Sequence, residues 1–245
     1  MTKSTKIYLG VVLVFVGLLV ASVFFPAFSS LIPPESGLSQ TDLVLLNIGM
    51  GLGVYGGLGY LGYRVSLSLG FPAIWDPGVT QRDRFYVPMV VGLLVGCLLV
   101  GGDLVFSTLH NLGPLPHPAF PLSVLATATA GIGEEIIFRL FFIPIWMWLI
   151  SRPFRGEHLG VIFWVVATMS AIAFSAAHLP AAPLILGVDS IGDIPTAMMA
   201  EIFLLNSAVA LPAAYYLRKS GFLAAVGIHF WNNVVWHIIY GALQG

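Results

Sequence analysis

The side chains with the clearest potential for chemistry are three charges in an apolar stretch: Glu134, Glu135 and Arg139. Only 9% of the 245 residues are charged, yet these three fall within six positions. A lone charge at the centre of a bilayer costs at least about 2.5 kcal/mol, so a cluster is expected to face a protein-lined cavity. Glu135 and Arg139 are four residues apart and share a helical face, which predicts an internal ion pair.

Glu134 differs from Glu135 by about 100° around a helix. The spacing therefore predicts that the two carboxylates cannot face the same partner and that Glu134 has no partner on its own helix. Such a carboxylate suits a general base working near neutral pH. A second structural hydrogen bond is an equally open interpretation of Glu134.

Two more pairs share the spacing of four residues, Phe174 with His178 and His229 with Asn233. An imidazole and an amide one turn apart supply donors suited to a developing oxyanion. Histidine and carboxylate on separate helices could instead hold a metal. A His-Glu-x-x-His motif is absent from the sequence, which excludes a zincin-type site.

The elements that must position these residues are membrane-spanning helices. The chain is 58% hydrophobic, with a mean hydropathy of +0.95, and apolar stretches of about 20 residues match the thickness of a bilayer. We expect one integral membrane domain over 1–245, an all-α polytopic bundle of seven to eight spans. The expected spans are 7–32, 43–63, 87–109, 121–150, 160–188 with an internal break at Pro180 and Pro183, 194–217 and 221–242. The break predicts a polar pocket near His178, because it frees backbone carbonyls.

Lysines and arginines follow a one-sided pattern along these spans. Nine of the ten fall in alternate connections and the tenth is Arg139. The positive-inside rule therefore predicts an odd number of spans with the amino terminus in the cytoplasm, and we expect the plasma membrane. The net charge of −1 offers no basic surface for nucleic acid.

The chain resembles the CPBP family in three motifs that occur in the same order. They are Glu-Glu-x-x-x-Arg at 134–139, Phe-x-x-x-His at 174–178 and His-x-x-x-Asn at 229–233. This family, also called Abi, contains CAAX proteases and bacteriocin-processing enzymes, and its eukaryotic members are type II CAAX prenyl endopeptidases. The motifs cover about 121–242, which would be the protease core.

The resemblance implies an intramembrane endopeptidase. Glu134 would activate water, His178 would help to hold that water, and His229 with Asn233 would stabilise the oxyanion. Glu135 and Arg139 would be structural or secondary. Family members are commonly labelled metalloproteases, so a divalent metal such as zinc at Glu134, His178 and His229 stays open. The partners would be membrane lipids and a peptide or lipidated protein substrate.

Two other functions are compatible with the sequence: a non-catalytic scaffold or immunity protein of the same fold, and a proton-coupled transporter with a carboxylate relay. Asp103, Glu201 and His237 could line the same cavity, although helix packing is favoured for each. His110, His117 and His158 fall in or beside loops and are assigned no chemistry. We expect the cavity to open toward the cytoplasmic half.

Overall fold

A computed structural model describes residues 1–25 and 37–244, and within these ranges the regular secondary structure is helical, without strands. The predicted all-α polytopic bundle is confirmed. The end of the first expected span, 26–32, lies outside the described residues.

Within the described ranges, six helical segments are long and apolar enough to cross a membrane. They are α1 (Lys3–Ser22), α3–η2–α4 (Gln40–Gly49, Met50–Gly56, Gly57–Ser68), η3–α5 (Arg82–Tyr86, Val87–Phe106), α8 (Leu159–Ala177), α10 (Thr196–Ser220) and α11–η6–α12 (Phe222–Asn233, Val234–Tyr240, Gly241–Gln244).

A further continuous helix carries the three clustered charges. It consists of α6 (Leu122–Glu134), η4 (Glu135–Phe142) and α7 (Ile143–Ser151) and corresponds to the expected span 121–150. Two short elements, α9 (Ala182–Leu186) and η5 (Ile191–Asp193), lie between α8 and α10.

Two π-helical turns coincide with the candidate site. η4 begins at Glu135, and η6 begins directly after Asn233. A π-turn contains an extra residue, so it widens the helix and changes which side chains share a face. Such turns are frequent at functional sites, because they re-aim side chains at a local cost in helix regularity.

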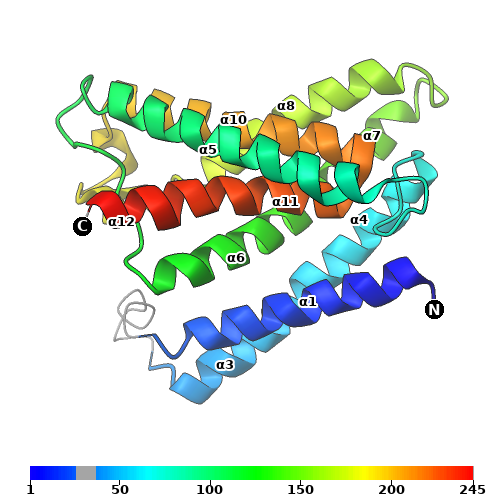
Figure 1. Cartoon of the computed structure of the whole chain (residues 1–245), viewed down its shortest axis with the longest axis horizontal. Helices are drawn as coiled ribbons and strands as arrows, with labels where there is room; N and C mark the ends of the chain where they lie inside the picture. The colour runs from blue at the N-terminus through cyan, green and yellow to red at the C-terminus, as the bar shows by residue number, and fades with distance from the viewer. Residues whose placement is uncertain (26–36, 245) are drawn as a thin grey trace.

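The segments run back and forth along the long axis, so that the two termini lie at opposite ends of the bundle (Figure 1). The amino terminus and the connections after α4, α7 and α10 lie at one end, which we call the basic end. The connections after α5 and α8 lie at the other end with the carboxyl terminus (Figure 1). The nine lysines and arginines of the basic end are Lys3, Lys6, Arg64, Arg82, Arg84, Arg152, Arg155, Arg218 and Lys219.

Glycines allow α4 to pack directly on η4. A Cβ atom on Gly59 would lie 2.8 Å from Ile136, and one on Gly62 would collide with the carbonyl oxygen of Leu140. Small residues at such contacts let helix backbones approach closely in a membrane. This contact with α4 holds in place the helix that carries Glu134 and Glu135.

The helix break predicted in the fifth span is present. α8 ends at Ala177, His178 caps its carboxyl end, and α9 starts at Ala182 after a turn that includes Pro180. Proline cannot continue the hydrogen-bond ladder of a helix, which explains why α8 stops here. His178 is thereby placed at a helix end inside the bundle.

Candidate active site

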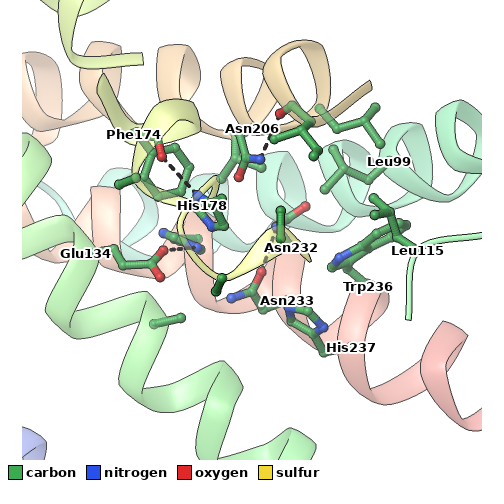
Figure 2. Close-up of a pocket in the computed structure, with 18 of the residues that line it drawn as sticks. Leu99, Leu115, Glu134, Phe174, His178, Asn206, Asn232, Asn233, Trp236 and His237 are labelled. Atoms are coloured by element: carbon green, nitrogen blue, oxygen red, sulfur yellow. Dashed lines mark hydrogen bonds and ion pairs between the residues drawn. The ribbon is translucent and has the colours of Figure 1, made fainter. Parts of the chain in front are cut away.

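A cavity of about 430 Å³ lies among α5, α6, α8, α9, α10, α11 and η6. Leucine, isoleucine, valine and aromatic side chains form most of its wall. Figure 2 shows Glu134, His178 and Asn233 approaching this space from three different helices. The polar residues of the lining are Glu134, His178, Asn206, His229, Asn232, Asn233 and His237.

His229 lies between the two glutamates. Its Nδ1 atom donates a hydrogen bond to Glu135 Oε1 at 2.8 Å, and its Nε2 atom lies 3.5 Å from Glu134 Oε2. The expectation that the carboxylates could not share a partner is therefore wrong. The helix widens where α6 passes into η4, between the two residues, and one imidazole presents its two nitrogens on different sides of the ring.

The two glutamates differ in their exposure. The Glu135 side chain is fully buried, whereas 34% of the Glu134 side chain is accessible, and Glu134 lies in the lining of the cavity. Because the Nδ1 proton of His229 is committed to Glu135, the contact between Nε2 and Glu134 requires a proton on one of these two groups. Glu134 is therefore the carboxylate that can meet both a proton donor and a small molecule in the cavity.

The predicted ion pair between Glu135 and Arg139 is present. Arg139 Nε lies 3.4 Å from Glu135 Oε1, and both side chains are fully buried. The guanidinium also stacks over the ring of Phe174 at 4.4 Å. A cation on an aromatic face is stabilised by the quadrupole of the ring. Arg139 thus balances the charge of Glu135 from inside the bundle.

His178 is oriented by its own helix. Its Nδ1 atom donates a hydrogen bond to the carbonyl oxygen of Phe174 at 2.9 Å, the i−4 position. The spacing of four that made the pair conspicuous in the sequence therefore corresponds to a real contact. With Nδ1 occupied, Nε2 of His178 is the nitrogen left for a molecule in the cavity.

Asn232 and Asn233 form a side-chain pair on α11. Asn232 Nδ2 donates to Asn233 Oδ1 at 2.9 Å, and both side chains are buried. Because the oxygen of Asn233 accepts this bond, its NH₂ group is left as the donor for the cavity. That arrangement fits a group that must stabilise negative charge.

The geometry does not favour a metal at Glu134, His178 and His229. Within residues 1–25 and 37–244, no three His, Cys, Asp or Glu side chains are placed to hold a metal ion. His229 uses one nitrogen on Glu135 and faces Glu134 with the other, and the Nδ1 atom of His178 is committed to a backbone carbonyl. A ligand set that points its donors at one another does not converge on an ion.

Asp103 and Glu201 lie outside the lining of the cavity and hold a loop instead. Asp103 accepts hydrogen bonds from the backbone of Leu115 at 2.8 Å and from the Tyr240 hydroxyl at 2.7 Å. Glu201 contacts His110 Nε2 at 3.0 Å, with both side chains fully buried. The packing role favoured for the two acids fits these contacts, whereas His110 was not expected to take part.

His237 on η6 does line the cavity. It contacts His117, which lies in the connection between α5 and α6, with 3.2 Å between the two Nδ1 atoms. Asn206 on α10 also lines the cavity and was not predicted from the sequence. It could have been identified as a single amide side chain in an apolar helix. Figure 2 shows Asn206 on the side of His178. His158 stays in an exposed connection, as expected.

The cavity extends away from the basic end. Its lining takes in Leu115 and Pro116 and the residues of α9, which belong to the opposite end of the bundle (Figure 1). The sequence led us to expect an opening toward the cytoplasmic half. Because the assignment of the cytoplasmic end rests on the positive-inside rule alone, this expectation stays a prediction. α8 stops at Ala177, and residues of α9 and of the turn before it line this side of the cavity.

The fold and the site together define a helical membrane protein with a carboxylate and imidazoles facing an internal cavity. Residues 116–235 match the family described as type II CAAX prenyl endopeptidase Rce1-like, which supports a CAAX protease family for this chain. The matched range contains all three motifs. No curated protein and no solved structure matches the chain.

Proposed function

We propose that the chain is an intramembrane endopeptidase that hydrolyses a peptide bond with water activated by Glu134. The observation that carries this proposal is the convergence of Glu134, His178, His229 and Asn233 on one cavity of about 430 Å³. A structural role would not require these four polar side chains from three helices to face a space whose wall is mostly apolar. Intramembrane ionisable residues mark functional sites for the same reason.

In the proposed reaction, a water molecule lies between Glu134 and the Nε2 atom of His178. Glu134 takes one proton from this water, and the oxygen of the water attacks the carbonyl carbon of the substrate. Because Glu134 is a carboxylate at the start of this step, the proton of its contact with His229 is on Nε2. This N–H group and the NH₂ group of Asn233 face the oxygen on which negative charge develops. The carbon–nitrogen bond then breaks, and Glu134 passes its proton to the departing amine, which regenerates the carboxylate.

The wall of the cavity points to the kind of substrate. Leucine and isoleucine side chains from α5, α9 and α10 surround the polar groups, so an apolar or lipid-modified segment is accommodated at low cost. Peptides that are already held at a membrane, such as prenylated carboxyl termini or hydrophobic leader peptides, meet this requirement. The family description, which names prenyl endopeptidases, favours the first of these.

The alternatives fit the geometry less well. A transporter would need a continuous relay, but Asp103 and Glu201 lie outside the cavity lining and hold a loop. A scaffold has no use for a carboxylate that is kept accessible beside two imidazoles. We therefore retain the protease as the conclusion.

Peptide profiling of membranes tests the proposal and the substrate class together. Cells that express the wild-type chain are compared with cells that express Glu134→Gln at the same membrane level. We expect new peptide ends in the wild-type sample alone, and a purified assay with farnesylated and unprenylated versions of one peptide then separates the substrate classes. Identical peptide profiles from the two chains would contradict the proposal.

A further inference from the structure

Of the two charged side chains of the cluster that the proposed reaction does not use, Glu135 is the one in contact with His229. It is fully buried, and its Oε1 atom contacts two residues, His229 Nδ1 at 2.8 Å and Arg139 Nε at 3.4 Å. Glu135 does not line the cavity, so it cannot meet the substrate directly. Any effect of Glu135 on the reaction must therefore pass through His229.

From these contacts we infer that Glu135 is a positioning residue: it holds the Nδ1 proton of His229 so that Nε2 faces Glu134 and the cavity. The inference rests on the proposed function, and its geometry rests on the contacts of Glu135 with His229 and Arg139 and of His229 with Glu134. A carboxylate can only accept, so the 2.8 Å bond requires the proton to be on Nδ1. A ring held at one nitrogen cannot turn the other away from the site.

Arg139 and Phe174 complete this arrangement. The guanidinium stands 3.4 Å from Glu135 and 4.4 Å over the ring of Phe174, while the Phe174 ring meets His229 edge-on at 5.8 Å between centroids. The backbone carbonyl of Phe174 also fixes His178. The buried ion pair and Phe174 thus hold the imidazoles of His229 and His178 on the side away from the cavity.

The neighbouring residue Ile136 offers a matched control. It is fully buried in the same turn, but it faces Gly59 on α4, away from His229. Ile136→Ala loosens the packing of η4 without touching the imidazole. Any loss that comes only from a weakened helix will therefore appear in this variant as well.

The experiment compares Glu135→Leu, Glu135→Gln and Ile136→Ala in purified, folded protein, assayed with a farnesylated peptide below the melting temperature of every variant. We expect Glu135→Leu to lower kcat about 100-fold with little change in KM, because a misoriented donor costs about as much as a missing one. Glu135→Gln keeps an oxygen that accepts the Nδ1 proton, so it should recover most of that loss. Ile136→Ala should be less stable than the wild type but keep its kcat.

A second readout follows the imidazole itself and does not depend on cleavage. In protein with ¹⁵N-labelled histidine, the His229 signal, assigned through His229→Gln, should report a protonated Nδ1 in the wild type and in Ile136→Ala. In Glu135→Leu it should shift toward the mixture of tautomers of a free ring. An unchanged His229 signal in Glu135→Leu, or a kcat equal to that of the wild type, would overturn the inference. A wild type that cleaves nothing but shows the expected shift would instead contradict the proposed function and leave the positioning role standing.

Discussion

Arg139 is fully buried, and Glu135 is its only ion-pair partner among the described residues. Arg139→Ala should therefore lower the free energy of unfolding by about 3–5 kcal/mol, because it leaves the Glu135 carboxylate buried without a counter-charge. The measurement is thermal unfolding in detergent together with the yield of monodisperse protein.

The double variant Arg139→Ala with Glu135→Ala serves as the control for this prediction. Removing both charges should recover part of the lost stability, since the two effects are coupled through one contact. A double variant less stable than Arg139→Ala alone would show that the pair does not act as a unit.

At the residue scale, the sequence was informative wherever a contact stays within one helix. The Glu135–Arg139 pair and the bond from His178 to Phe174 both follow from the four-residue spacing. The sharing of His229 by two glutamates could not be predicted, because it depends on the π-turn that starts at Glu135. Where a helix widens is decided by its neighbours in space, and these are not visible in a spacing pattern.

At the scale of elements, the segment 107–121, which we call the strap, closes one side of the cavity with Leu115 and Pro116. Asp103 accepts hydrogen bonds from the backbone N–H of Leu115 and from the hydroxyl of Tyr240. Asp103→Ala should leave the buried Tyr240 hydroxyl without its acceptor, at a cost of about 1–3 kcal/mol, and should free the half-buried N–H of Leu115.

Hydrogen exchange tests this effect on the strap. Amides around residue 115 should exchange faster in Asp103→Ala than in the wild type, whereas Asp189→Ala, an exposed position on the same end, should change nothing. Unchanged protection in Asp103→Ala would show that the strap is held by its apolar contacts alone.

His117 gives the strap a dependence on pH. Burial lowers the pKa of His117 below its ordinary value of 6.5, and the nearby Asp103 opposes this shift only in part. Its other neighbours are His237, Trp236 and Tyr240. Since the folded state resists protonation more than the unfolded state does, the contribution of His117 to stability is full above about pH 6.5 and falls as the pH drops below it.

His117→Gln should therefore lose less stability than the wild type when the pH is lowered from 8 to 5.5. Thermal unfolding at several pH values measures the difference, and His158→Gln, at an exposed site on the basic end, is the matched control. Equal acid sensitivity in the wild type and in His117→Gln would contradict the assignment.

The sequence predicted where helices begin and end better than it predicted which elements contact one another. Pro180 correctly indicated the end of α8, because a proline acts on its own helix. The anchors of the strap, His110 on Glu201 and His117 on His237, join residues about a hundred positions apart and had no local signal.

At the scale of the whole molecule, the alternation of the helices in Figure 1 places the nine basic residues at one end and the two termini at opposite ends. We predict that the basic end is cytoplasmic. A reporter that is active only outside the cytoplasm should work after residue 244 and fail within 152–158. Activity at both positions, or only at the second, would contradict this orientation.

Glu134, the accessible carboxylate beside His229, is the group that activates water in the proposed reaction. The decisive measurement is kcat on a farnesylated peptide for the wild type, for Glu134→Gln and for Glu157→Gln, an exposed glutamate on the basic end. Glutamine keeps the size of the side chain but cannot take a proton from water, so Glu134→Gln should lose at least about 100-fold in kcat while its melting temperature stays close to that of the wild type. Glu157→Gln should be fully active. Wild-type turnover by folded Glu134→Gln would contradict the account.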